Sequence, residues 1–150
     1  IFVIIGTFPS LVYYFFFVYK HRQNLFKYIA IPREVRFNVY LLTIYSFLFL
    51  TILFRSQGDS SWMNLSILLV IFFSAMFLIN RYLDKASMHV ATFSFAIIYL
   101  IDKMSTTFAL LFFILPAIFW ARLNLKRHTW IQLFLGAIIG MVVGLLSWNI

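Results

Sequence analysis

The sequence has no cysteine and very little charge. Without cysteine the chain forms no disulfide, carries no thiolate nucleophile and offers no sulfur ligand to a metal. Charged residues make up only 11% of the 150 residues, whereas 64% are hydrophobic, including 20 phenylalanines. Soluble domains average roughly 45–50% apolar residues, because their exterior must be largely polar. The composition therefore excludes a soluble domain and predicts an integral membrane protein.

The few charges are mostly positive, and the net charge is +8. Such an excess can indicate nucleic acid binding. Here, however, the 12 basic residues lie in short stretches between apolar runs, a pattern typical of membrane topology signals. We therefore expect membrane lipids, and no nucleic acid, as partners.

Six apolar stretches approach or reach the roughly 17–25 residues that a helix needs to cross the hydrocarbon layer. They are residues 1–19, 37–54, 61–80, 88–101, 105–120 and 129–148. The fourth is short and would lengthen if it extended backward through Asp84 and Lys85. The sequence thus predicts an all-α integral membrane protein, a six-transmembrane-helix bundle forming one domain over residues 1–150. Because the first residue is isoleucine, we expect the chain to begin inside a longer protein.

The basic residues alternate between the two sides of this predicted bundle. The connections after the first, third and fifth stretches hold five, two and three of them, which is ten of the 12 in the chain. By the positive-inside rule this face is cytoplasmic and both termini lie outside. Trp120 and Trp130 fall at the basic face and Trp62 and Trp148 at the other, as interfacial aromatic belts predict.

Glycines and prolines mark special positions within the apolar stretches. Gly136, Gly140 and Gly144 recur every four residues, so they share one helix face and let another backbone approach closely. Pro116 predicts a kink in the fifth stretch and Pro9 a similar break in the first.

The stretch ARLNLKRHTWIQ, residues 121–132, gathers basic side chains between two apolar runs. Thr129 is the predicted N-cap of the sixth helix, which places His128 beside free backbone N–H groups that favour phosphate. Gln132 follows His128 by four residues, so its amide oxygen can accept the Nδ1 proton and leave Nε2 available as a nucleophile. Arg122 offers a planar fork suited to phosphate oxygens.

Two other segments of the basic face carry candidate site residues. In DKASMHV, residues 84–90, Lys85, Ser87 and His89 alternate, so in an extended or turning segment all three could point to one side. There Lys85 would neutralise a phosphate, Ser87 would donate a hydrogen bond and His89 would protonate a leaving alkoxide. In IPREVRFN, residues 31–38, Arg33 and Arg36 begin the second stretch. Contact with lipid headgroups explains Arg33 as well as a site role does.

In this order the pieces resemble the type 2 phosphatidic acid phosphatase superfamily, membrane lipid phosphate phosphatases related to vanadium haloperoxidases. The family signatures are KxxxxxxRP, PSGH and SRxxxxxHxxxD. Arg122 and His128 reproduce the R-x5-H spacing, Gln132 stands where the aspartate would, and residues 86–89, ASMH, fall where PSGH would. The resemblance covers residues 33–144 and points to a divergent bacterial branch, notably one found in Bacteroidetes.

The resemblance implies a set of roles and a location. His128 would attack phosphorus, His89 would protonate the leaving group, and Arg122 with Ser87 would bind phosphate, without a metal or other cofactor. Lys85 or Arg36 would stand in for the first signature, which this chain lacks. The expected location is the bacterial inner membrane.

The sequence also departs from the family pattern. Ala121 replaces a serine, Met88 a glycine and Gln132 the orienting aspartate, and loss of an orienting carboxylate costs a catalytic triad about 10⁴-fold. Two functions therefore stay open: a lipid phosphate phosphatase using a histidine nucleophile, or a catalytically silent member of the fold that serves as a membrane-complex subunit or headgroup binder. A transporter is the third alternative, weakened by the few charges within the spans and by the lack of an inverted repeat.

Overall fold

The computed structural model describes residues 2–20, 33–83 and 85–150, and every regular element within those ranges is helical. The order is α1 (Phe2–Lys20), α2 (Arg33–Gln57), α3 (Ser60–Tyr82), α4 (Met88–Lys103), the 3₁₀-helix η2 (Thr106–Ile114), α5 (Leu115–Asn124), α6 (Trp130–Leu145) and the short 3₁₀-helix η3 (Leu146–Asn149). The predicted all-α fold class is confirmed.

Four helical stretches are long and apolar enough to cross a membrane: Val35–Gln57, Ser60–Tyr82, Thr106–Asn124 and Trp130–Asn149. They support the prediction of a helical membrane protein. Helix α4 is shorter, with 16 residues, about 24 Å at ~1.5 Å per residue, against a hydrocarbon layer of about 30 Å. The apolar part of α1, Ile4–Lys20, is also shorter than these four.

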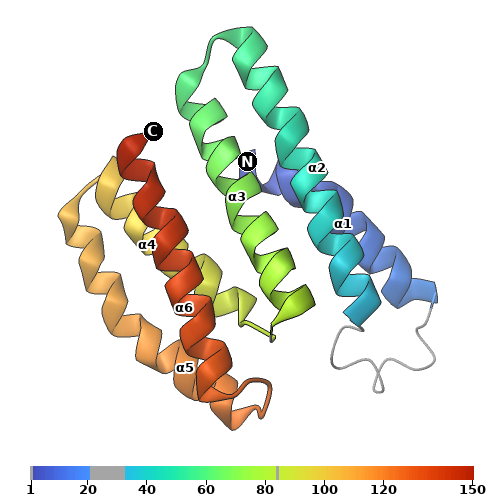
Figure 1. The fold of residues 1–150 in the computed structure, drawn as a ribbon, viewed down its shortest axis with the longest axis vertical. Helices are drawn as coiled ribbons and strands as arrows, with labels where there is room; N and C mark the ends of the chain where they lie inside the picture. Colours follow the sequence, from blue (N-terminus) through green and yellow to red (C-terminus); the bar gives the residue numbers. More distant parts are fainter. Residues whose placement is uncertain (1, 21–32, 84) are drawn as a thin grey trace. The chain divides into compact units, whose positions relative to one another are not determined.

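The chain divides into two compact units, Ile1–Phe77 and Leu78–Ile150. In the first, α1 lies along α2 (Figure 1). Its interior is aromatic: Phe47 is fully buried and stacks on Phe73 with ring centroids 5.8 Å apart. Phe2 lies 5.0 Å from the Trp62 ring. This unit contains no residue of the 84–90 or 121–132 segments.

The second unit is built on a close pairing of α4 and α6 (Figure 1). A Cβ on Gly136 would lie 2.6 Å from the Ser87 carbonyl oxygen, and one on Gly140 would collide with the Ala91 carbonyl. A Cβ on Gly144 would lie 2.7 Å from the Ile98 Cβ. Residue numbers rise together along both helices, so α4 and α6 are parallel and both begin at the same end. The expected close approach at the glycines is confirmed, and its partner is α4.

Three local expectations differ from the structure. Residues 85–87 are not helical, so α4 does not extend backward through Lys85; Asp84 lies outside the described residues. The 105–120 stretch is no single kinked α-helix, because η2 precedes α5 and Pro116 lies in the first turn of α5, where a missing N–H costs no hydrogen bond. Pro9 lies inside α1, which continues through it as one helix.

Candidate functional site

A reciprocal cap fixes the start of α6. The Thr129 hydroxyl oxygen accepts a hydrogen bond from the Gln132 N–H at 3.4 Å, and the Gln132 Oε1 accepts one from the Thr129 N–H at 3.3 Å. This is a capping box, in which each of the two side chains satisfies a backbone donor that the helix leaves unpaired. The prediction of Thr129 as N-cap is confirmed.

The same amide oxygen holds the His128 ring. The His128 Nδ1 lies 3.2 Å from the Gln132 Oε1. Since an amide oxygen only accepts, Nδ1 is the donor, which places the proton of the neutral ring on Nδ1. The ring also hydrogen bonds with the backbone of Lys85. The contact predicted from the four-residue spacing is therefore present, and the cap explains why the amide points at the ring.

A tight turn between α5 and α6 brings Arg122 back toward this site. The Arg127 N–H donates to the Arg122 carbonyl at 3.2 Å and the Lys126 N–H to the Leu123 carbonyl at 2.8 Å, the two bonds of a Schellman motif. Lys126 has a φ of 51°, at the position that usually holds glycine. The Lys85 Nζ lies 3.5 Å from the Arg127 carbonyl oxygen, so the 85–87 segment is attached to this turn.

The 85–89 segment forms the start of α4 beside that of α6. The Ser87 N–H donates to the Gln132 carbonyl at 3.0 Å, which joins the two helix starts. Ser87 is the N-cap residue of α4, but its side chain makes no capping bond; its hydroxyl is fully buried and has no hydrogen-bond partner. His89 is exposed in the first turn of α4. The structure thus separates the Ser87 hydroxyl from solvent, while Lys85 and His89 remain at the surface or partly exposed.

We call the positively charged and histidine side chains of these two segments the basic end: Lys85, His89, Arg122, Lys126, Arg127 and His128. Segments 85–89 and 121–132 contain no aspartate or glutamate. Arg122 is close enough for its charge to act on both His89 and His128. The amino ends of α4 and α6 add partial positive charge at the same place. The basic end is therefore suited to an anion.

The environment keeps the His128 ring neutral. Burial, followed by the charges of Lys85 and Arg122, lowers the pKa of His128 below its ordinary value, and the hydrogen bonds to Gln132 and to the Lys85 backbone only partly oppose this. A ring with a lowered pKa is unprotonated at pH 7. A neutral imidazole is the form that can act as a nucleophile.

The remaining predicted site residues belong to the first unit. Arg33 and Arg36 lie at the start of α2, so the site as described consists of residues from the second unit. Among the described residues, no group of three histidine, cysteine, aspartate or glutamate side chains could hold a metal ion.

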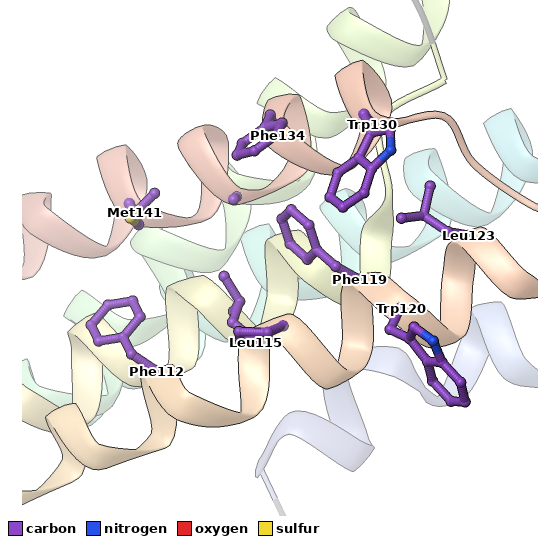
Figure 2. Close-up of a pocket in the computed structure, with 10 residues that line it drawn as sticks. Phe112, Leu115, Phe119, Trp120, Leu123, Trp130, Phe134 and Met141 are labelled. Atoms are coloured by element: carbon purple, nitrogen blue, oxygen red, sulfur yellow. The ribbon is translucent and has the colours of Figure 1, made fainter.

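An apolar groove of about 460 Å³ lies between η2, α5 and α6. Figure 2 shows the rings and aliphatic side chains from these helices facing one another across it. Phe119 is central, with its centroid 5.4 Å from that of Phe134 in an edge-on arrangement and 6.3 Å from that of Trp130. This groove is not predictable from the sequence, because apolar residues in a membrane segment carry no signal that separates a groove from a lipid-facing surface.

The reciprocal role of Gln132 was also missed. The signal was present in the sequence as T-x-x-Q at a helix start, which is the capping-box pattern.

Comparison with known proteins adds nothing to this site: no family model matches the chain, and no curated protein and no solved structure matches it.

Proposed function

We propose that this protein is a membrane lipid phosphate phosphatase similar to the type 2 phosphatidic acid phosphatases, with His128 as its nucleophile. The observation that carries the proposal is the 3.2 Å contact between the His128 Nδ1 and the Gln132 Oε1, because a proton on Nδ1 favours the tautomer in which Nε2 carries a lone pair. The lowered pKa of His128 supports the same assignment. The proposal includes six transmembrane helices in a bacterial inner membrane, with the basic end cytoplasmic and both termini outside.

In the proposed reaction the His128 Nε2 attacks the phosphorus of a lipid phosphate. A nitrogen–phosphorus bond forms as the ester oxygen–phosphorus bond breaks. His89, which the negative charge of the bound phosphate keeps protonated, donates its proton to the departing alkoxide. Water then attacks phosphohistidine and gives one proton to neutral His89, which releases inorganic phosphate and restores both neutral His128 and protonated His89. Arg122 and the helix amino ends stabilise the charge on the phosphoryl oxygens. No step requires a metal.

Fewer observations support a phosphate-binding role for three other basic residues, Lys85, Arg33 and Arg36. The charge of Lys85 already acts on the His128 ring, so a phosphate bound at His128 would also lie within the electrostatic reach of Lys85. Arg33 and Arg36 enter only through the resemblance to the first family signature.

A second candidate function is a silent member of the same fold that binds lipid headgroups or serves as a membrane-complex subunit. Two observations favour it. The Ser87 hydroxyl, expected to bind phosphate, has an exposed fraction of 0%. Gln132 divides one oxygen between the His128 ring and the Thr129 N–H, and a neutral amide stabilises the imidazolium that forms during catalysis less than a carboxylate does.

Phosphate release by the purified protein separates the two functions. The substrates are phosphatidic acid, phosphatidylglycerol phosphate and undecaprenyl pyrophosphate, and the variants are His128→Ala and, as a matched control, His21→Ala. We expect release by the wild type and by His21→Ala, and a loss of roughly 10³-fold or more in His128→Ala. Equal release by His128→Ala would exclude the nucleophile role.

Gln132→Glu sharpens this test. Glutamate has the length of glutamine, so it keeps the capping box, and its charge stabilises the imidazolium. A phosphatase should become faster in this variant. Activity that is absent in the wild type and appears only in Gln132→Glu would favour the silent member.

A further inference from the structure

The two faces of α6 differ in the size of their side chains. Gly136, Gly140 and Gly144 face α4, where backbone meets backbone. The other face presents Trp130, Phe134 and Met141 to the groove (Figure 2). Helices that associate within membranes do so mainly through small residues. The groove face has few small residues, and its aromatic and aliphatic walls suit a hydrocarbon chain.

The depth of the groove matches one leaflet. Trp130 and Met141, which line it on α6, are eleven residues apart in the sequence, or about 16 Å at ~1.5 Å per residue. The hydrocarbon layer is about 30 Å thick, so one leaflet contributes roughly half of it. The groove is therefore long enough for one hydrocarbon chain of a lipid in one leaflet, and too short for a segment that crosses the whole membrane.

The charge at one end of the groove identifies the kind of molecule that the chain belongs to. Leu123 lines the groove and directly follows Arg122, and Trp130 lines it two residues after His128. The groove therefore begins at the basic end, which carries no carboxylate in segments 85–89 and 121–132, and continues into the apolar region. An anionic headgroup at the basic end would leave its hydrocarbon chain at the mouth of the groove.

We propose that the groove between η2, α5 and α6 binds one hydrocarbon chain of a lipid whose phosphate is held at the basic end. The inference rests on the proposed function for the identity of the headgroup. It requires only that the lipid binds, whether or not the protein hydrolyses it. The length of the groove then selects the length of the hydrocarbon chain. Arg122 and the amino ends of α4 and α6 bind the phosphate.

The test measures binding directly, with dioleoyl phosphatidic acid as the probe and native mass spectrometry of the detergent-solubilised protein as the readout. Met141→Trp places a larger side chain at the deep end of the groove. Val142→Trp is the matched control: Val142 is adjacent, 55% exposed and does not line the groove. We expect at least tenfold weaker retention of dioleoyl phosphatidic acid in Met141→Trp, wild-type retention in Val142→Trp, and no difference among the three proteins for dihexanoyl phosphatidic acid.

Equal retention of the dioleoyl lipid by Met141→Trp and wild type would overturn the proposal. So would wild-type retention of dioleoylglycerol at the same concentration, because the phosphate would then contribute nothing. Failure of the phosphatase assignment has a different signature: His128→Ala retains the dioleoyl lipid, Met141→Trp loses it, and the wild type releases no phosphate.

Discussion

The two ends of the α4–α6 pair are joined in similar ways but differ in charge. At the amino ends the Ser87 N–H donates to the Gln132 carbonyl at 3.0 Å, and at the carboxyl ends the Lys103 Nζ donates to the Ser147 carbonyl at 3.0 Å. Lys103 also forms an ion pair with Asp102 at 3.0 Å. The amino ends instead gather the six side chains of the basic end.

The difference in charge between the two ends indicates a role for the basic end. A cation at a helix carboxyl end is favourable, and a cation at an amino end is unfavourable, because of the helix dipole. Lys103 therefore stabilises the end where it lies, and Arg122 does the same in the last turn of α5. Lys85, by contrast, adds positive charge beside the amino ends of α4 and α6, which are already positive. The Ser87–Gln132 hydrogen bond and the close approach at Gly136 join the two helix starts without side-chain charge, so most of the positive charge of the basic end is not needed for this packing. An anionic ligand is the simplest account of that charge.

The largest expected effect comes from removing one cation at each end. Arg122→Gln should weaken binding of a phosphate lipid by roughly tenfold to 100-fold, the equivalent of the ~1.5–3 kcal/mol of a charged hydrogen bond. Lys103→Gln should leave that binding unchanged and lower thermal stability, because it removes the bond to Ser147. Lipid titration and thermal unfolding in the same detergent measure both. Equal effects of the two variants on binding would remove the distinction between the ends.

Short-range spacing made part of this site predictable. The N-cap at Thr129 and the contact between His128 and Gln132 follow from the geometry of one helical turn, and the structure contains both. The start of α4 at Met88 also agrees with the predicted stretch.

The features that could not be predicted from the sequence depend on contacts between residues that are far apart in the chain. The Ser87 hydroxyl is buried because its backbone packs against Gly136 and donates to Gln132, a contact across more than forty residues. Alternation along 85–89 therefore gave no reliable indication of which side chains face solvent. The 3₁₀ conformation of η2 was equally hidden, since its nine residues are apolar in either helix type.

A substitution at the glycine face should disturb both ends at once. A Cβ on Gly140 would collide with the Ala91 carbonyl and lie 2.9 Å from the Phe95 nitrogen, and backbone atoms of packed helices move little. Gly140→Leu should lower the free energy of unfolding by about 1–3 kcal/mol, as overpacking does, and weaken lipid binding with it. Val142→Leu, on an exposed position of α6, is the control. Unchanged thermal unfolding of Gly140→Leu would mean that α4 and α6 are not held this closely.

The pH profile tests the electrostatics of the basic end. The charge of Lys85 lowers the pKa of His128, so Lys85→Gln should raise it. In the proposed reaction the neutral ring is the nucleophile, so the acid limb of the pH–rate profile falls as the pH drops through this pKa. The acid limb of the pH–rate profile should therefore move to higher pH in Lys85→Gln. Lys126→Gln is the matched control, since its charge is not among the causes of the shift, and its acid limb should coincide with that of the wild type.

The smallest effect concerns the turn that brings Arg122 and His128 together. Lys126 is the one non-glycine residue with positive φ in the described part of the chain, and such a backbone costs an L-residue about 1–2 kcal/mol relative to glycine. Lys126→Gly should raise the free energy of unfolding by about 1 kcal/mol, measured by thermal unfolding, whereas Arg127→Gly should give no such gain, because Arg127 has no positive φ to relieve. A strained backbone at the basic end, with an ion pair at the opposite end, fits the proposal that the basic end binds a ligand, because backbone strain persists at functional sites. If Lys126→Gly is more stable and also binds phosphatidic acid less tightly, the lysine is retained for its charge. If Lys126→Gly is more stable and binds phosphatidic acid as the wild type does, the charge of Lys126 does not contribute to binding. Binding of the phosphate then depends on the other three cations, Arg122, Arg127 and Lys85, and the comparison is between those cations at one end and the single ion pair at the other.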